Sequence, residues 1–106
     1  MRQLAGVVLA GLALSACFPR SAALPAVDAA MAERARLTWP DASRAQLQRG
    51  HDLVVTTCNA CHQTPAIDAQ STEAWPHTVE RMSRYAKLKN PADVEAITRY
   101  YVAAAR

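Results

Sequence analysis

The sequence predicts an all-α protein, and three observations favour this class. Alanine, the strongest helix former, is abundant, whereas only three of the 106 residues are glycine. Beyond residue 40, apolar residues recur three and four positions apart, which is the spacing of one helix face. No segment alternates apolar and polar residues as a half-buried strand does. Because 51% of the residues are hydrophobic, we expect a folded chain rather than a disordered one.

The amino end has the features of an export signal. Arg2 is followed by an uncharged apolar run over residues 4–14, which is too short for a permanent membrane span, and small residues then lead to Cys17. The alternative, a buried helix with Cys17 in the core, is disfavoured by this position at the extreme amino end. The segment Leu14-Ser15-Ala16-Cys17 resembles the lipobox of bacterial lipoproteins. The resemblance implies that residues 1–16 are removed, that Cys17 carries a diacylglyceryl anchor, and that Phe18 favours sorting to the outer membrane.

Removal of the signal leaves 106 − 16 = 90 residues, which allow one domain. The mature net charge is small, 11 − 9 = +2, and the sequence has no long basic run, so we exclude nucleic acid as a partner. A chain of this length builds a marginal core, so we expect a covalent or bound stabiliser.

Residues 17–40 are rich in Ala, Pro and Arg and show no sustained periodicity beyond a short helix after Asp28. They predict a tether between the lipid anchor and the domain. A flexible tether of about 25 residues has a root-mean-square reach of roughly 27 Å. Trp39, which precedes Pro40, either covers the core or covers the edge of a cofactor.

The folded domain is expected over residues 41–106, with three main helices. Asp41 or Ser43 caps a helix that runs to about Thr56, and Ser71 or Thr72 caps a second one. Their inward faces consist of Leu47, Gly50, Leu53 and Val54 in the first helix and of Trp75, Val79, Met82 and Ala86 in the second.

The third helix begins at Asn90-Pro91, with asparagine as the cap and proline in the first turn. Val94, Ile97 and Tyr101 form its inward face. A loop over residues 63–70 connects the first two helices.

The sequence Cys58-Asn59-Ala60-Cys61-His62 carries the chemistry. Two thiols three positions apart suit thioether bonds to one haem, and the adjacent imidazole suits its iron, so this pattern predicts one covalent c-type haem. A zinc site is an alternative and needs a fourth ligand, for which His51 or His77 is available. A redox dithiol is a second alternative, but it needs a βαβ context that the sequence lacks.

Residues 43–106 resemble a small class I monohaem cytochrome c. Gly50 and Val54 stand eight and four positions before Cys58, where the first helix of that family has a glycine and a large apolar residue. Tyr100 matches the aromatic residue of the terminal helix that packs across this glycine, and the small Gly50 permits a close crossing. Residues 75–82 further resemble small haem domains that partner periplasmic dehydrogenases.

The resemblance implies His62 as proximal ligand and a methionine as distal ligand. Met82 is the candidate, because the other two methionines lie in the signal and the tether. A methionine on an apolar helical face is also a common core residue. We expect His62 to donate its other ring nitrogen to a carbonyl in the loop around Pro65. The rival distal ligands are His77 and, more remotely, Lys87 and Lys89.

These features predict an exported, lipid-anchored monohaem cytochrome with a three-to-four-helix fold, which carries one electron and is not an enzyme. Its partners are redox proteins, such as a periplasmic dehydrogenase or a terminal oxidase, and it lies at the periplasmic face of a bacterial membrane. The basic residues Arg81, Arg84, Lys87 and Lys89 are either a solvated helix face or a surface that steers an acidic partner. An alternative function, with an open or labile distal site, is a haem sensor, a gas-binding protein or a weak peroxidase.

Overall fold

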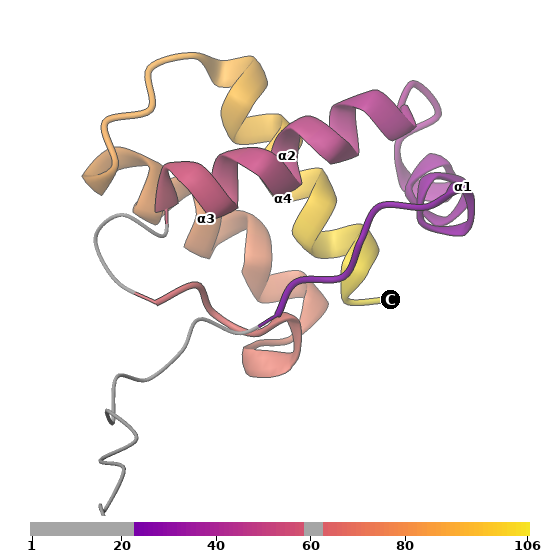
Figure 1. The fold of residues 1–106 in the computed structure, drawn as a ribbon, viewed down its shortest axis with the longest axis horizontal. Helices are drawn as coiled ribbons and strands as arrows, with labels where there is room; N and C mark the ends of the chain where they lie inside the picture. The colour runs from indigo at the N-terminus through magenta and orange to yellow at the C-terminus, as the bar shows by residue number, and fades with distance from the viewer. Residues whose placement is uncertain (1–22, 59–62) are drawn as a thin grey trace, which may run out of the picture.

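The computed structural model describes residues 23–58 and 63–106, and in this part of the chain every regular element is helical (Figure 1). The predicted all-α class is therefore confirmed. None of the helices in these ranges is both long and apolar enough to cross a bilayer. The elements are α1 (Ala29–Thr38), α2 (Arg44–Thr56), η2 (Ile67–Ala69), η3 (Thr72–Ala74), α3 (Trp75–Tyr85) and α4 (Pro91–Ala104), where η denotes a 3-10 helix.

Local capping sets where α2 and α4 begin. The Ser43 hydroxyl accepts a hydrogen bond from the amide of Gln46 at 3.0 Å. The Asn90 side chain accepts one from the amide of Ala92 at 3.0 Å, and Pro91 occupies the first turn of α4. Of the two caps proposed for α2, the structure therefore uses Ser43.

The start of α3 differs from the prediction. Ser71 precedes the 3-10 helix η3 and makes no capping bond with its side chain, and α3 itself begins at Trp75 after Ala74. The polar residues therefore mark the start of a 3-10 turn, and the α-helix begins two residues later than the Thr72 cap implied. Pro76 lies in the first turn of α3, where the missing amide costs no intrahelical bond.

Helices α2 and α4 cross closely at Gly50. A Cβ atom built on Gly50 would lie 2.1 Å from the carbonyl oxygen of Ala96 and 3.0 Å from the amide nitrogen of Ile97. Only glycine permits this approach of the two backbones, so the predicted close crossing is confirmed. Tyr100, one turn further along α4, is fully buried and packs edge-on against His51, with ring centres 5.4 Å apart.

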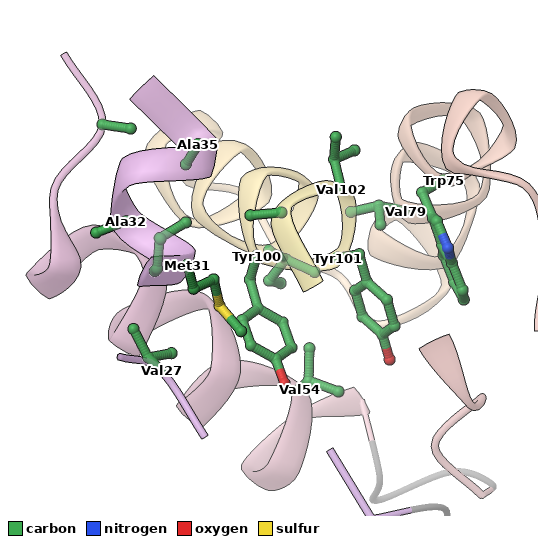
Figure 2. Close-up of a cluster of buried hydrophobic side chains, with 14 of the residues drawn as sticks. Val27, Met31, Ala32, Ala35, Val54, Trp75, Val79, Tyr100, Tyr101 and Val102 are labelled. Carbon is green, nitrogen blue, oxygen red and sulfur yellow. The ribbon is translucent and has the colours of Figure 1, made fainter. Parts of the chain in front are cut away.

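Helix α1 belongs to the core, which corrects the prediction of a tether over residues 17–40. Met31, Ala32 and Ala35 are at most 2% exposed and face α4, next to Val27 and Tyr100 (Figure 2). The amino end of α1 is capped by a side chain, that of Asp28, which accepts a hydrogen bond from the amide of Met31 at 2.8 Å.

Further polar contacts fasten α1 and the residues before it. The Arg34 guanidinium donates to the carbonyl of Ala103 at 3.4 Å, and the Tyr100 hydroxyl donates to the carbonyl of Pro25 at 2.7 Å. The packed unit therefore includes residues before 41, and the predicted domain boundary is wrong. Residues 17–22 of the predicted tether lie outside the described part of the chain.

Trp39 packs against this core. Its ring is partly buried, and the guanidinium carbon of Arg99 lies 5.3 Å from the ring centre. It lines a groove with Leu88 and Pro91 between α3 and α4, separate from the cavity that contains Cys58. Of its two predicted roles, covering the core is the one that the structure supports.

Candidate functional site

A small apolar cavity lies where the end of α2 meets α3 and α4. Its volume is about 30 Å³, which is room for roughly one or two water molecules. Cys58 lies at the carboxyl end of α2, two residues after Thr56, and contributes to the wall. The lining residues are Cys58, Pro65, Trp75, Thr78, Val79, Met82, Ser83, Ile97 and Tyr101.

Aromatic rings form one side of this cavity. The rings of Trp75 and Tyr101 stack with their centres 4.2 Å apart, and Tyr100 packs edge-on against Tyr101 at 5.7 Å (Figure 2). Burial raises the pKa of the Tyr101 phenol, and the nearby Cys58 adds to this effect. Burial likewise raises the pKa of Tyr100. Trp75 and the neutral Tyr101 give the cavity a wall of low polarity.

Three polar side chains of the wall, those of Trp75, Thr78 and Tyr101, form hydrogen bonds to the loop over residues 65–70. Because these atoms already have partners, the inner surface of the cavity is left apolar. The same bonds hold the loop against α3 and α4. They run from the Tyr101 hydroxyl to the Pro65 carbonyl at 3.5 Å, from the Trp75 indole to the Ile67 carbonyl at 3.1 Å, and from the Thr78 hydroxyl to the Gln70 side-chain oxygen at 2.6 Å.

Met82 is the candidate distal ligand that lines the cavity. It is partly buried, lies one turn after Thr78 on α3, and shares the cavity wall with Cys58. His77, the main rival, is exposed at the start of α3 and does not line the cavity. Lys87 and Lys89 are exposed too, in the segment that follows α3.

Three predicted site residues, Cys17, Cys61 and His62, lie outside the described residues. The two ends of the interval from 59 to 62 are informative, because Cys58 before it and Pro65 shortly after it both line the cavity. The chain therefore leaves α2 at the cavity and lies at the cavity again at Pro65.

The structure also bears on the zinc alternative. Within residues 23–58 and 63–106, no three His, Cys, Asp or Glu side chains are grouped so that they could hold a metal ion. The Nδ1 atom of His51 lies 3.0 Å from the carboxylate of Asp52 on the surface of α2, and His77 lies on α3. Neither histidine lines the cavity with Cys58.

The basic residues that were singled out in the sequence are exposed. Arg84 forms an ion pair with Glu80 at 3.3 Å on the surface of α3. Tyr85 lies among these residues and is 78% exposed, so an aromatic ring accompanies the charges. The exposed basic residues are Arg81, Arg84, Lys87 and Lys89.

Sequence reasoning placed Trp75 and Tyr101 on inward helix faces but did not foresee that they stack on each other at the site. The role of Thr78 in holding the loop was also missed. The available signal was the position of Thr78 directly before Val79, at the edge of the predicted apolar face. No known protein family, characterised protein or solved structure matches this chain. The site is therefore interpreted from its own residues.

Proposed function

We propose that this chain is a c-type cytochrome that carries one electron between redox partners at the periplasmic face of a bacterial membrane. In this proposal Cys58 and Cys61 bind one haem through thioether bonds, His62 and Met82 ligate the iron, and Cys17 carries the lipid anchor. The bound haem supplies a one-electron couple of ferrous and ferric iron. The chain itself catalyses no reaction.

One observation carries the proposal. Cys58 and Met82 are far apart in the sequence and belong to different elements, yet both line the same apolar cavity. In a covalent haem with His/Met ligation, the motif thiols would bind the porphyrin and the methionine sulfur would bind the iron, so a motif cysteine and a methionine are expected at one site. His77 is exposed, which argues against it as the distal ligand.

The residues present fit a haem by their chemistry. Trp75, Val79, Ile97 and Tyr101 offer aromatic and aliphatic surface at the cavity. Apolar surroundings lower the local dielectric constant, and a methionine ligand raises the reduction potential relative to a second histidine. Because the cavity volume is only about 30 Å³, the walls must move apart to hold a porphyrin.

A denaturing absorbance spectrum tests the attachment. We expect haem absorbance to stay with the polypeptide after denaturation, and the intact mass to exceed that of polypeptide plus lipid by one haem. A double substitution, Cys58→Ser with Cys61→Ser, should abolish both signals. Colourless protein from cells with a working maturation system would contradict the proposal.

The distal ligand is tested by the near-infrared spectrum of the ferric protein. We expect a sulfur-to-iron charge-transfer band that Met82→Ala removes and that the control His77→Ala leaves unchanged. If Met82→Ala keeps the band, the assignment of Met82 is wrong.

Carbon monoxide separates the carrier from the alternative function. A firm methionine ligand makes binding of carbon monoxide to the reduced protein slow or weak, and Met82→Ala should make it fast. Fast binding to the unsubstituted protein would instead favour a gas sensor or a weak peroxidase.

The surface near Met82 supports an acidic redox partner. Arg81, Arg84 and Lys87 give this end of α3 an excess of positive charge, of which Glu80 offsets one unit. Electrostatic steering accelerates association at low ionic strength and weakens as salt increases. We expect the rate of electron transfer to an acidic partner to fall with added salt.

A further inference from the structure

We propose that one particular face of the domain is held against the lipid surface, and that the basic turn after α3 is held away from it. The face meant here, called the anchor face, consists of Ala23, Pro25, residues 66–68 and 70–73, and the carboxyl end of α4 at residues 104–105, which together line a groove of about 660 Å³. This inference rests on the proposed function in one respect, the lipid at Cys17.

The chain becomes fixed to the domain at Leu24. The Tyr100 hydroxyl, which is buried, donates to the Pro25 carbonyl at 2.7 Å. Leu24 packs partly buried against the core, and Val27 is only 6% exposed. The chain is therefore fastened from Leu24 onward, so that the stretch between the lipid and the domain is much shorter than residues 17–40.

The stretch between Cys17 and the domain is short. Cys17 and Leu24 are seven residues apart in the sequence. A fully extended chain of this length spans at most about 24 Å. For comparison, any flexible chain of seven residues has a root-mean-square length of about 15 Å.

The domain is wider than this tether is long. A compact domain of roughly 80 residues has a radius of gyration near 12 Å, which corresponds to a diameter of about 30 Å. For the face opposite Leu24 to contact the lipid, the tether would have to span about this diameter, which exceeds its maximum length. The face opposite Leu24 therefore cannot contact the lipid, and the anchor face is the one nearest to the point of lipid attachment.

The geometry of the fold then decides which residues lie far from the lipid. In Figure 1 the indigo segment that begins at residue 23 runs beside the loop after residue 63. The turn over residues 86–90 lies at the opposite side of the molecule. This turn, which contains the exposed Lys87, consequently lies on the side away from the lipid, where a redox partner has access to it.

Charge does not explain this orientation. The anchor face contains two exposed carboxylates, Asp68 and Glu73. Carboxylates do not attract anionic headgroups, so the short tether alone holds the face there. We therefore expect the same orientation on vesicles of neutral phosphatidylcholine, and little effect of added salt.

Hydrogen–deuterium exchange of the full lipidated protein in phosphatidylcholine vesicles tests the orientation. We expect slower exchange over residues 66–73 than in the Cys17→Ser variant mixed with the same vesicles. Exchange over residues 86–90 should be the same in both. Slower exchange over residues 86–90 would overturn the proposal. Unchanged exchange over residues 66–73 would overturn it too.

A second variant tests the role of the tether length. A flexible Gly/Ser insertion of about 20 residues between Arg20 and Ser21 brings the root-mean-square length to roughly 30 Å, the size of the domain. We expect this insertion to abolish the slower exchange over residues 66–73. If the slower exchange persists, direct binding rather than tether length causes it, and the proposal fails.

Intact mass separates this inference from the proposed function. A protein without the lipid mass would overturn both the membrane anchor and the orientation, whatever its haem content. A protein that has the lipid mass and shows slower exchange over residues 86–90 would overturn the orientation alone. Absence of haem mass would overturn the electron-carrier proposal alone.

Discussion

The crossing of α2 and α4 predicts a strong effect of Gly50→Ala. Alanine favours a helix over glycine by about 1 kcal/mol, so this substitution would stabilise an isolated α2. In the folded protein, however, the added Cβ would lie 2.1 Å from the Ala96 carbonyl oxygen and 2.6 Å from its carbon. Both atoms belong to the backbone, so no side-chain rotation relieves the overlap.

The helices must instead separate, which loosens the contacts of core residues on both. Leu47 and Val54 on α2 and Ile97 on α4 are at most 2% exposed. Overpacking a core typically costs 1–3 kcal/mol, and a backbone collision belongs at the upper end, about 3 kcal/mol. After the helix propensity gain of about 1 kcal/mol, a net loss of about 2 kcal/mol remains. For a domain of this size, that loss lowers the melting temperature by roughly 8–16 °C.

Urea denaturation followed by circular dichroism measures this loss on the protein with and without the substitution. The matched control is Ala45→Gly, the reverse exchange at an exposed position of α2. It should cost about 1 kcal/mol through helix propensity alone. If Gly50→Ala is as stable as the unsubstituted protein, or more stable, then the reasoning about the crossing is wrong.

Three further predictions concern other parts of the fold. Met31→Ala should lower the free energy of unfolding by about 2–5 kcal/mol, because Met31 is 2% exposed, whereas Leu37→Ala at an 86% exposed position of α1 should change it little. Equal effects of the two substitutions in a urea titration would argue against α1 as a part of the core. Lys87→Gly should stabilise the protein by about 0.5–1 kcal/mol, because Lys87 has a φ of 56°, which favours glycine, and thermal unfolding would reveal the gain. A lower melting temperature would contradict this prediction. Burial raises the pKa of Tyr100 and Tyr101 above the ordinary value of 10.0, so the folded state keeps protons that the unfolded state releases. The stabilisation is complete below pH 10 and is lost as the pH rises further, by up to about 1.4 kcal/mol per pH unit for each tyrosine, and a pH series of urea titrations should show this decline.

The helices after residue 40 were predictable because local signals agree there with the tertiary packing. Ser43 and Asn90 cap α2 and α4 as their side chains predict, and the inward faces were recognisable from their spacing. The tight crossing at Gly50 was expected from a resemblance in sequence, and the backbone contact with Ala96 explains it physically.

A short helix after Asp28 was expected, but the burial of α1 in the core was missed because its buried face is made mostly of small residues. Ala32 and Ala35 contribute little hydrophobic signal to a sequence pattern, and an alanine-rich stretch also resembles a linker. What makes this face a core surface is its close approach to α4, including the bond from Arg34 to the Ala103 carbonyl. Such long-range contacts leave no periodic trace in the local sequence.

The candidate site was predictable in its residue types but not in its construction. The spacing of Cys58 and the position of Met82 on an apolar face were visible in the sequence. The bonds that fasten the loop to Trp75 and Tyr101 depend on the way in which α3 and α4 pack, so they could not be predicted.

The packing of α1 also changes the argument for a cofactor. A domain limited to residues 41–106 would need a bound group to complete its core. Met31 and Val27 add apolar surface to the core that a domain limited to residues 41–106 would lack. The size of the chain alone is therefore weak support for a haem. The proposal depends on the attachment motif and on the cavity shared by Cys58 and Met82. It follows that the variant without the two motif cysteines should retain helical structure and a cooperative unfolding transition, even though it binds no haem.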